Sequence, residues 1–423
     1  MHSPGTIYQT IDHLFRHESG KMVSVLSRLL GLQNLETAQD IAQDTLLQAM
    51  NTWSYNGIPD NPAAWLYRVA KNKAVDFLRR EKKFREISPN YSYLLQSEYS
   101  LTPTVNNLFL ENEIQDSQLR MMFACSHPSI AEESQIALTL KTLCGLSANE
   151  IAKAFLTNEE NISKRIYRAK EKIKTEKIEL NVPQGNELFL RLDAVLKSLY
   201  LLFNEGYNSS HPDQLIREDL CEESMRLTYL LTTHGVTNLP RTNALLSLMC
   251  FQASRLEARL DDKGNIILLK YQDRNKWYRP LVQRGFEYLE IATATEIFET
   301  STYHLEAAIA SLHAVAPSFE QTDWKSIYDL YGMLYQLQPA PIVALNKAIA
   351  SAYAIGRENA LNQLLQIKGL ENYYLYHTSI GEIYFELQNK NEAKKFYEKA
   401  LHLTTSRQEQ QLLISKIRNC ETV

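Results

Sequence analysis

The sequence predicts an all-α protein, and three observations support that prediction. Glycine and proline are scarce, with 14 and 13 among 423 residues, so turn signals are few and the segments between them are long. Those segments repeat apolar residues at helical spacing. Several of them begin with helix-capping patterns, such as the one at residues 147–150. One exception is expected after the turn at 261–265, where residues 266–269 have the composition of a short strand.

The overall composition limits the class of protein. A chain of 423 residues is long enough for about two to four domains with apolar cores. No apolar run reaches the ~18 residues that a membrane span requires, and the N-terminus lacks a signal-peptide core. The five cysteines are scattered and form no paired framework, as is typical of a reducing compartment. We therefore expect a cytoplasmic protein.

Catalytic and metal chemistry have little support in the sequence. There is no nucleophile motif, metal cluster or phosphate-binding loop, so we predict that the chain is not an enzyme. Cys125 and His127 are close enough to share a metal, but a lone Cys and His without a second pair are more typical of core packing. Neither a metal nor a cofactor is predicted.

Charge is unevenly distributed along the chain. The net charge is −4, which by itself argues against a nucleic-acid partner. Residues 1–178 sum to about +1, however, and the remainder to about −5. Within the first part the positive charge gathers on two predicted helices, and such a local cluster is what DNA binding requires.

The first of these basic helices belongs to an N-terminal group of three. Helices are expected at 7–30 and 36–53. A third, at 63–83, starts where Asn61 supplies an N-cap and Pro62 occupies the first turn. Its exposed positions carry mainly basic and amide side chains, namely Arg68, Lys71, Asn72, Lys73, Arg79, Arg80, Lys82 and Lys83.

The second basic helix is one of a pair near residue 150. Ser147 and Glu150 form a capping box, and Thr157 and Glu160 repeat it ten residues later. The second helix has one apolar stripe, formed by Ile162, Ile166, Ala169 and Ile173. Its other faces are polar or basic, with Asn161, Ser163, Lys164, Arg165, Arg168, Lys172 and Lys174. This pattern predicts a helix-turn-helix that enters a DNA major groove; a solvated basic face is the alternative.

Composition and turn signals divide the chain into five predicted segments. These are a helical bundle at 1–87, a linker at 88–110, the helix-turn-helix unit at 111–180, a helical extension at 186–335 and tetratricopeptide-like helical repeats at 336–423. Five residues near the C-terminus fall at the spacing of a tetratricopeptide unit of about 34 residues, namely Gly381, Tyr384, Ala393, Tyr397 and Ala400. A simple pair of antiparallel helices is the alternative there.

Two stretches of the N-terminal part together resemble a known family. Residues 39–47 and 62–80 resemble region 2 of extracytoplasmic-function sigma factors, and residues 136–173 resemble region 4 of the same family. The C-terminal half resembles the long extension of one subgroup with a tetratricopeptide-like tail. The matching stretches there are 201–207, 271–277 and the pair Asp323-Trp324, with Tyr271 and Asn275 departing from the usual pattern.

This resemblance implies two partners, the RNA polymerase core and promoter DNA. A polar helix face would dock on the clamp of the largest core subunit, through Asp40, Gln43, Asp44 and Leu47. The −10 element would meet Tyr55, Asn56, Trp65, Lys71, Asn72, Lys73, Arg79 and Arg80. The −35 major groove would meet Asn161, Ser163, Lys164, Arg165 and Arg168, with Arg165 as the candidate for guanine contact. For Trp65, core packing is the alternative to base stacking.

For the extension, the resemblance implies a regulatory role, with Asp273, Arg274 and Trp277 as a candidate motif. An ion-paired helix junction packed by Trp277 is the structural alternative. Tetratricopeptide hairpins present concave surfaces to proteins, so a regulatory protein is a further candidate partner. We expect the extension to control the sigma module, either by masking its DNA faces or by contacting polymerase.

Together these features predict an alternative sigma factor that directs promoter recognition and transcription initiation. Two alternatives remain open. One is a helix-turn-helix regulator that reads DNA as a dimer without polymerase. The other is a tetratricopeptide-type scaffold whose basic helices are incidental. The region 2 pattern favours the first interpretation.

Overall fold

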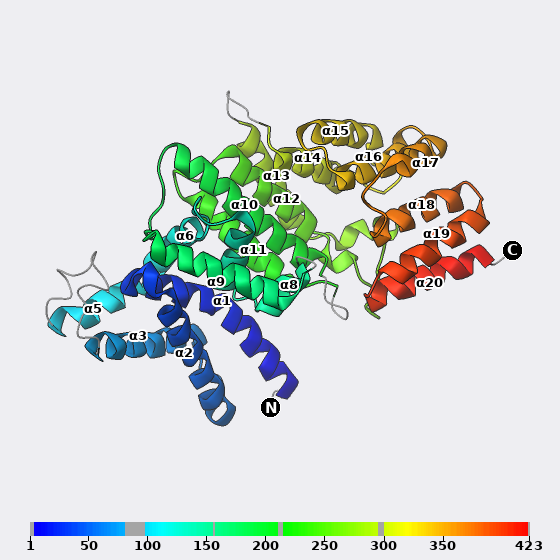
Figure 1. Ribbon diagram of the computed structural model, residues 1–423. Coiled ribbons are helices and arrows are strands. Elements are labelled where there is room, and N and C mark those ends of the chain that lie inside the picture. The colour runs from blue at the N-terminus through cyan, green and yellow to red at the C-terminus, as the bar shows by residue number, and fades with distance from the viewer. Residues whose placement is uncertain (1–3, 81–97, 155–156, 210–214, 295–299, 422–423) are drawn as a thin grey trace. The chain divides into compact units, whose positions relative to one another are not determined.

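The computed structural model describes residues 4–80, 98–154, 157–209, 215–294 and 300–421, and every regular element in those ranges is a helix (Figure 1). The all-α prediction is confirmed. The expected strand at 266–269 is wrong, because one antiparallel bridge, Leu260 to Ile266, forms there instead. The chain then turns into the 3-10 helix η4, Leu269–Tyr271, and leaves no run of residues free to pair.

The described residues form two compact units, Met1–Leu202 and Phe203–Val423. Unit 1 begins with a group of helices that matches the predicted bundle, namely α1 Pro4–Leu30, η1 Leu32–Asn34, α2 Leu35–Asn56 and α3 Pro62–Arg80. The Oδ1 of Asn61 accepts a hydrogen bond from the backbone N–H of Ala64 at 3.0 Å, so the predicted N-cap is confirmed. Residues 81–83, the predicted end of that helix, lie outside the described residues.

Unit 1 continues through the stretch predicted as a linker, which includes a helix. Its remaining helices are α5 Glu98–Leu108, α6 Glu111–Cys125, α7 Glu132–Thr142, α8 Ala148–Ala154, α9 Glu159–Thr175 and the larger part of α10 Asn186–Tyr207. Helix α1 packs against α6, where Arg28 forms ion pairs with Glu113 at 2.8 Å and Asp116 at 2.9 Å. A Cβ at Gly20 would lie 1.9 Å from the carbonyl oxygen of Leu143. Glycine at this position therefore permits close contact between α1 and the end of α7.

Unit 2 consists of helices that pack mainly against their neighbours in sequence. They are α11 Glu218–Thr233, α12 Pro240–Ala253, η3 Leu256–Ala258, η4, η5 Arg274–Lys276, α13 Arg279–Thr293, α14 Thr302–Val315, α15 Trp324–Leu337, α16 Pro341–Ala354, α17 Arg357–Gln366, α18 Tyr374–Glu386, α19 Lys390–Leu403 and α20 Arg407–Glu421. Among the described helices of either unit, none combines the length and apolar character needed to cross a bilayer.

The C-terminal helices α18 and α19 pack side by side, and α20 packs on α19 (Figure 1). Gly381 on α18 faces the ring of Tyr397 on α19, and a Cβ there would lie 2.8 Å from that ring. Ala393, Tyr397 and Ala400 are buried in the same cluster. These contacts explain why small residues recur at this spacing. Assignment of the hairpin to the tetratricopeptide family stays a prediction.

Candidate nucleic-acid interface

Helices α8 and α9 begin as capped helices, although the second cap differs from the predicted one. The backbone N–H of Ser147 donates to Oε2 of Glu150 at 2.8 Å, and the backbone N–H of Glu150 donates to Oγ of Ser147 at 3.2 Å. This reciprocal pair confirms the first capping box. At α9 the N-cap is Asn158, whose Oδ1 accepts from the backbone N–H of Asn161 at 2.9 Å. The predicted Thr157 box is therefore wrong by one residue, because the asparagine amide reaches the third N–H first.

The apolar stripe of α9 is buried as predicted. The polar side chains of this helix differ in their exposure and in whether they form ion pairs. Arg165 forms an ion pair with Glu133 of α7 at 2.6 Å, and its side chain is only 25% exposed. Lys164 pairs with Glu160 one turn away, also at 2.6 Å. Asn161 Nδ2 donates to Oγ1 of Thr157 at 3.2 Å. Of the candidate −35 residues, Ser163 and Arg168 are exposed and have no hydrogen bond or ion pair within the described chain.

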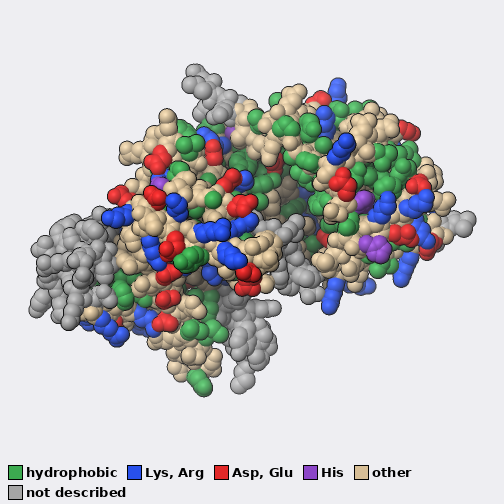
Figure 2. Space-filling model, viewed as in Figure 1, with side chains coloured by type: hydrophobic (Ala, Val, Ile, Leu, Met, Phe, Trp, Pro, Cys, Tyr) green, Lys and Arg blue, Asp and Glu red, His purple; other side chains and the backbone are tan. Residues whose placement is uncertain are grey.

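The C-terminal part of α9 contacts the start of α2. Lys174 lies 3.3 Å and Lys170 lies 3.8 Å from the carboxylate of Glu36. Burial lowers the pKa of the Lys170 ammonium, and the charge of Glu36 opposes that effect. Figure 2 shows Lys and Arg side chains interleaved with Asp and Glu side chains on this face of unit 1. Several cations of α9 are therefore paired with carboxylates of α2 and α7 or of α9 itself, while Arg168 has no such partner among the described residues.

A hollow of about 410 Å³ lies between α9 and the turn that precedes α7. Tyr167, Arg168 and Lys172 line it from α9, and residues 129–131 line it from the turn. Arg168 therefore stands at the edge of a concave surface, whereas Arg165 faces α7. Of the two arginines predicted to approach DNA, Arg168 is the more accessible.

The polar face predicted on α2 is one continuous exposed surface. Asp40, Gln43, Asp44 and Leu47 follow helical spacing and are all exposed, with Leu47 49% exposed. Asp44 lies 3.8 Å from the ammonium of Lys73 on α3. Met50, one turn after Leu47, is 40% exposed and extends the apolar part of this face. Met50 was not among the predicted docking residues, although its helical spacing from Leu47 indicates the same face.

Helix α3 carries the first basic cluster, and its members are in different environments. Asn72, Arg79 and Arg80 are exposed. Lys71 lies 5.5 Å from the centroid of the Phe109 ring, and burial lowers the pKa of its ammonium. Arg68 is exposed as well, so the cluster presents three exposed guanidinium groups and one exposed amide along α3, with Arg79 and Arg80 at the end of the helix.

The residues predicted to capture a base lie on either side of the loop before α3: Tyr55 and Asn56 end α2, and Trp65 lies in the first turn of α3. Tyr55 is 91% exposed, and Asn56 is exposed beside it. Trp65 is partly buried and meets the buried Trp53 edge-on, with 5.4 Å between ring centroids. Of the two aromatic candidates, Tyr55 is free to stack on a base, whereas Trp65 packs on the core.

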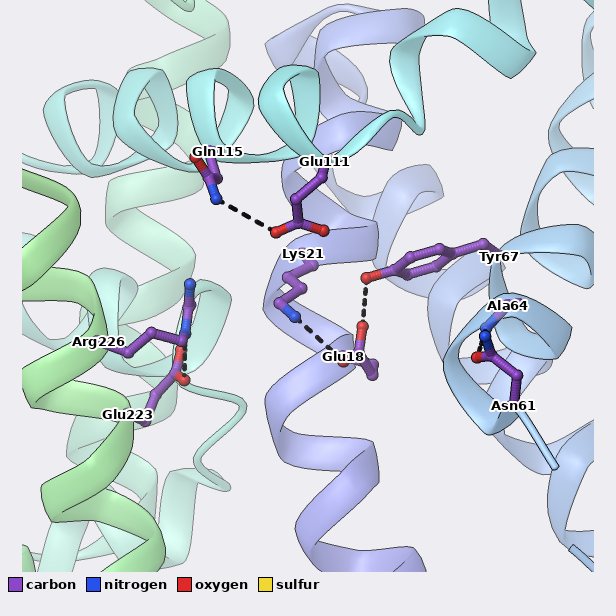
Figure 3. Close-up of polar contacts among 9 residues, drawn as sticks. All are labelled: Glu18, Lys21, Asn61, Ala64, Tyr67, Glu111, Gln115, Glu223 and Arg226. Carbon is purple, nitrogen blue, oxygen red and sulfur yellow. Dashed lines mark hydrogen bonds and ion pairs between the residues drawn. The ribbon is translucent and has the colours of Figure 1, made fainter. Parts of the chain in front are cut away.

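A buried carboxylate holds α1 against α3 within this region. Figure 3 shows Glu18 of α1 between Lys21, at 3.1 Å, and the hydroxyl of Tyr67 on α3, which donates to Glu18. Burial of Glu18 is tolerated because both of its oxygens have partners. This contact fixes the angle at which α3 presents its basic face. Nothing in the local sequence pattern marked Glu18, because its partner Tyr67 lies 49 residues away.

The candidate regulatory motif is positioned differently from the expected ion pair. Asp273 caps η5 by accepting from the backbone N–H of Asn275 at 2.9 Å, and no ion pair joins it to Arg274 among the described contacts. The guanidinium carbon of Arg274 lies 4.0 Å from the centroid of Trp277, which is 2% exposed. Packing by Trp277 is as expected, and the Asp–Arg pair is not formed. Among the described residues, no group of three or more His, Cys, Asp or Glu side chains could hold a metal ion.

Comparison with known families assigns both parts of the chain. Residues 14–84, which span most of α1 and all of α2 and α3, match Sigma-70 region 2. Residues 191–293 match a family of unknown function, DUF6596. No solved structure matches the chain significantly.

Individual relatives agree with this division. The chain is 35% identical to an uncharacterized protein of Rhizobium meliloti over 89% of its own length and 88% of that protein. It is 27% identical to the RNA polymerase sigma factor YlaC of Bacillus subtilis over 39% of this chain and 90% of that one. It is 28% identical to the ECF RNA polymerase sigma-E factor of Haemophilus influenzae over 36% of this chain and 79% of that one. The chain therefore belongs to the family of the Rhizobium meliloti protein, with an N-terminal part homologous to extracytoplasmic-function sigma factors, built on a Sigma-70 region 2 domain, followed by a DUF6596 extension.

Proposed function

We propose that this protein is an alternative sigma factor that binds the RNA polymerase core and directs recognition of promoter −10 and −35 elements. The match of residues 14–84 to Sigma-70 region 2 carries the proposal, because one segment holds both the exposed polar face of α2 and the basic face of α3. The relatives named as sigma factors cover the same part of the chain.

Core binding is assigned to the face of α2. Asp40, Gln43 and Asp44 offer two carboxylates and an amide to a basic partner surface. Leu47 and Met50 place exposed apolar area directly beside them. A polar rim around an apolar centre is the usual composition of a protein interface, which supports docking rather than a solvated face.

Promoter binding is assigned to the end of α2, to α3 and to α9. Arg79 and Arg80 would neutralise phosphates, and Asn72 would read a base edge. Tyr55 replaces Trp65 as the preferred stacking partner for an extruded base, because it is the exposed one. In α9, Arg168 can contact DNA directly. Arg165 can do so only after its ion pair with Glu133 is broken.

Run-off transcription with purified core polymerase on a genomic promoter library tests the activity. Asp40→Arg should reduce co-purification with core by at least about tenfold, since like charges across an interface cost several kcal/mol. Glu179→Arg, the same charge change at an exposed position after α9, is the matched control and should co-purify normally. Absence of initiation on every promoter, or equal core binding by wild type and Asp40→Arg, would overturn the corresponding part of the proposal.

We also propose that the extension controls the sigma module. A chain ending at residue 202 removes unit 2 at the boundary between the two compact units. If its circular dichroism retains the helical content of unit 1, a change in run-off yield relative to the full chain measures control. An unchanged yield at every promoter would contradict a regulatory role.

A further inference from the structure

Unit 2 contains a set of buried polar atoms that have no partner among the residues that the structure describes. Three of them lie around the candidate motif: Nη2 of Arg274, Nε1 of Trp277 and Nδ1 of His313. The first two can only donate hydrogen bonds. Leaving a buried donor unpaired is costly, so these groups require an acceptor beyond the residues that the structure describes, such as a water molecule or a bound ligand.

Two guanidinium groups share one indole ring in this cluster. The guanidinium carbon of Arg274 lies 4.0 Å from the centroid of Trp277, and that of Arg255, just after α12, lies 5.1 Å from it. The carbonyl oxygen of His313 accepts from Nη1 of Arg274 at 3.0 Å, which attaches η5 to α14. Residues from three separate segments of unit 2 therefore meet at Trp277.

Neither arginine has a carboxylate partner among the described residues. Arg255 donates only to neutral amide oxygens, those of Gln252 and Gln272, at 3.3 Å. Glu320, an exposed carboxylate whose charge acts on Arg274, forms no ion pair with it. Other cations of unit 2 do find carboxylates: Arg357 pairs with Glu386 at 2.9 Å, for example.

The pKa values of the cluster are consistent with two positive charges held close together. Burial, followed by the charge of Arg255, lowers the pKa of Arg274 to about 10, which still leaves it protonated at neutral pH. Burial lowers the pKa of His313 to about 3, and both arginines contribute to that shift. The histidine is therefore neutral, and among the described residues neither guanidinium group forms an ion pair; the exposed carboxylate of Glu320 acts on Arg274 only without direct contact.

We propose that the cluster of Arg255, Arg274, Trp277 and His313 binds a phosphate-class anion. A dianion would balance the two guanidinium charges, and tetrahedral oxygens accept well from planar guanidinium donors. Nη2 of Arg274 and Nε1 of Trp277 supply donors that have no acceptor among the described residues. Arg255 and Arg274 are partly exposed, whereas Nη2 of Arg274 and Nε1 of Trp277 are buried, so an anion would enter past the exposed parts of the two arginines. Inorganic phosphate and a small phosphomonoester share this chemistry.

Isothermal titration calorimetry of the full chain, in phosphate-free buffer, tests the site. The titrants are inorganic phosphate, glycerol 2-phosphate, succinate and sodium chloride at matched ionic strength. We expect saturable binding of one or both phosphate compounds, at least tenfold weaker in Arg274→Gln and severalfold weaker in Trp277→Phe. Arg279→Gln removes an exposed positive charge five residues along and should bind within twofold of wild type.

The two phosphate compounds identify the source of the anion. Tighter binding of glycerol 2-phosphate assigns the site to a phosphomonoester, and tighter binding of inorganic phosphate assigns it to the free ion. Binding of succinate alone, a response equal to that of chloride, or equal weakening by Arg279→Gln would overturn the proposal. Trp277→Phe keeps the aromatic packing, so it tests the site even if Arg274→Gln fails to fold. The measurement does not depend on promoter activity, and hence not on the proposed sigma function.

Discussion

Helix α9 of unit 1 and the junction around η5 of unit 2 both concentrate positive charge, yet they neutralise it in opposite ways. On α9, carboxylates approach the cations: Glu133 reaches Arg165 at 2.6 Å, and Glu36 reaches Lys174 at 3.3 Å. At η5, Arg274 is packed on Trp277 and has no carboxylate partner among the described residues. One site carries exchangeable surface pairs, and the other carries charge that the fold itself leaves unbalanced.

This difference in pairing distinguishes arginines in exchangeable surface ion pairs from arginines that have no carboxylate partner. A solvent-accessible ion pair contributes about 0–1 kcal/mol, so DNA phosphates can replace its carboxylate at little cost. A buried guanidinium without a counter-charge destabilises the fold, and such a feature persists where a ligand or a function requires it. Stability measurements on matched variants of the two sites should therefore differ in sign as well as size.

The largest expected effect concerns the ring on which both buried arginines pack. Trp277→Ala removes a side chain that is 2% exposed, so it should lower the free energy of unfolding by roughly 3–5 kcal/mol. Urea denaturation followed by circular dichroism measures this. If the free energy of unfolding fell by less than about 1 kcal/mol, the indole would not be needed to hold the junction together. The proposed difference between the junction and α9 would then be contradicted.

The next largest effect is a pH dependence of the free energy of unfolding, which we expect at the η5 junction because of His313. His313 has a folded pKa of about 3 against an ordinary 6.5, so the unfolded chain binds more protons between these values. Stability should therefore fall as pH drops from 6.5 towards 3, by up to about 5 kcal/mol for this group. His313→Phe keeps the ring and should flatten the profile in that window. An identical profile in the variant would contradict burial of a neutral histidine there.

A smaller effect of opposite sign is expected at Arg274. In anion-free buffer, Arg274→Met removes a partly buried charge that has no carboxylate partner among the described residues, and it should raise the free energy of unfolding by about 1 kcal/mol. Arg165→Met on α9 removes a paired surface charge and should lower it by less than about 1 kcal/mol. Chemical denaturation of both variants under the same conditions provides the comparison. Two changes of the same sign would show that the two sites are equivalent.

The smallest expected effect tests how exchangeable the α9 pairs are. Glu133→Gln releases Arg165 and should tighten DNA binding by roughly two- to fivefold at low salt, with stability changed by less than about 1 kcal/mol. Fluorescence anisotropy with labelled promoter DNA measures it. Glu160→Gln, which releases the more exposed Lys164, is the matched comparison and should have the weaker effect. Looser binding by Glu133→Gln would contradict a masking role for the pair.

Much of the local structure could be predicted because its causes lie within a few residues. The Ser147–Glu150 box, the Asn61 cap and the buried stripe of α9 each depend on side chains one or two turns apart. The wrong N-cap at Thr157 also reflects local structure, because Thr157 and Asn158 are adjacent and both can cap a helix. Only the observed geometry shows that Asn158 is the N-cap. Strand composition at 266–269 was outweighed by the lack of a pairing partner.

The candidate site was predictable in position but not in environment. Helical spacing placed Asp40, Gln43, Asp44 and Leu47 on one face, and they are exposed together. No pattern could indicate that Trp65 packs on Trp53, that Glu133 reaches Arg165, or that Arg255 joins Arg274 at one indole. Arg255 precedes Arg274 by 19 residues, and nothing in the chain between them signals the contact.

By itself, the sequence determined the helical class, most of the helix starts and the two basic faces, since capping and periodicity act over a few residues. Only the tertiary structure decided which charges are paired, which aromatic side chains are free, and which donors remain unused. These properties depend on contacts between residues that lie far apart in the chain. Pairing and desolvation are set by where separate helices meet, and local composition carries no information about that.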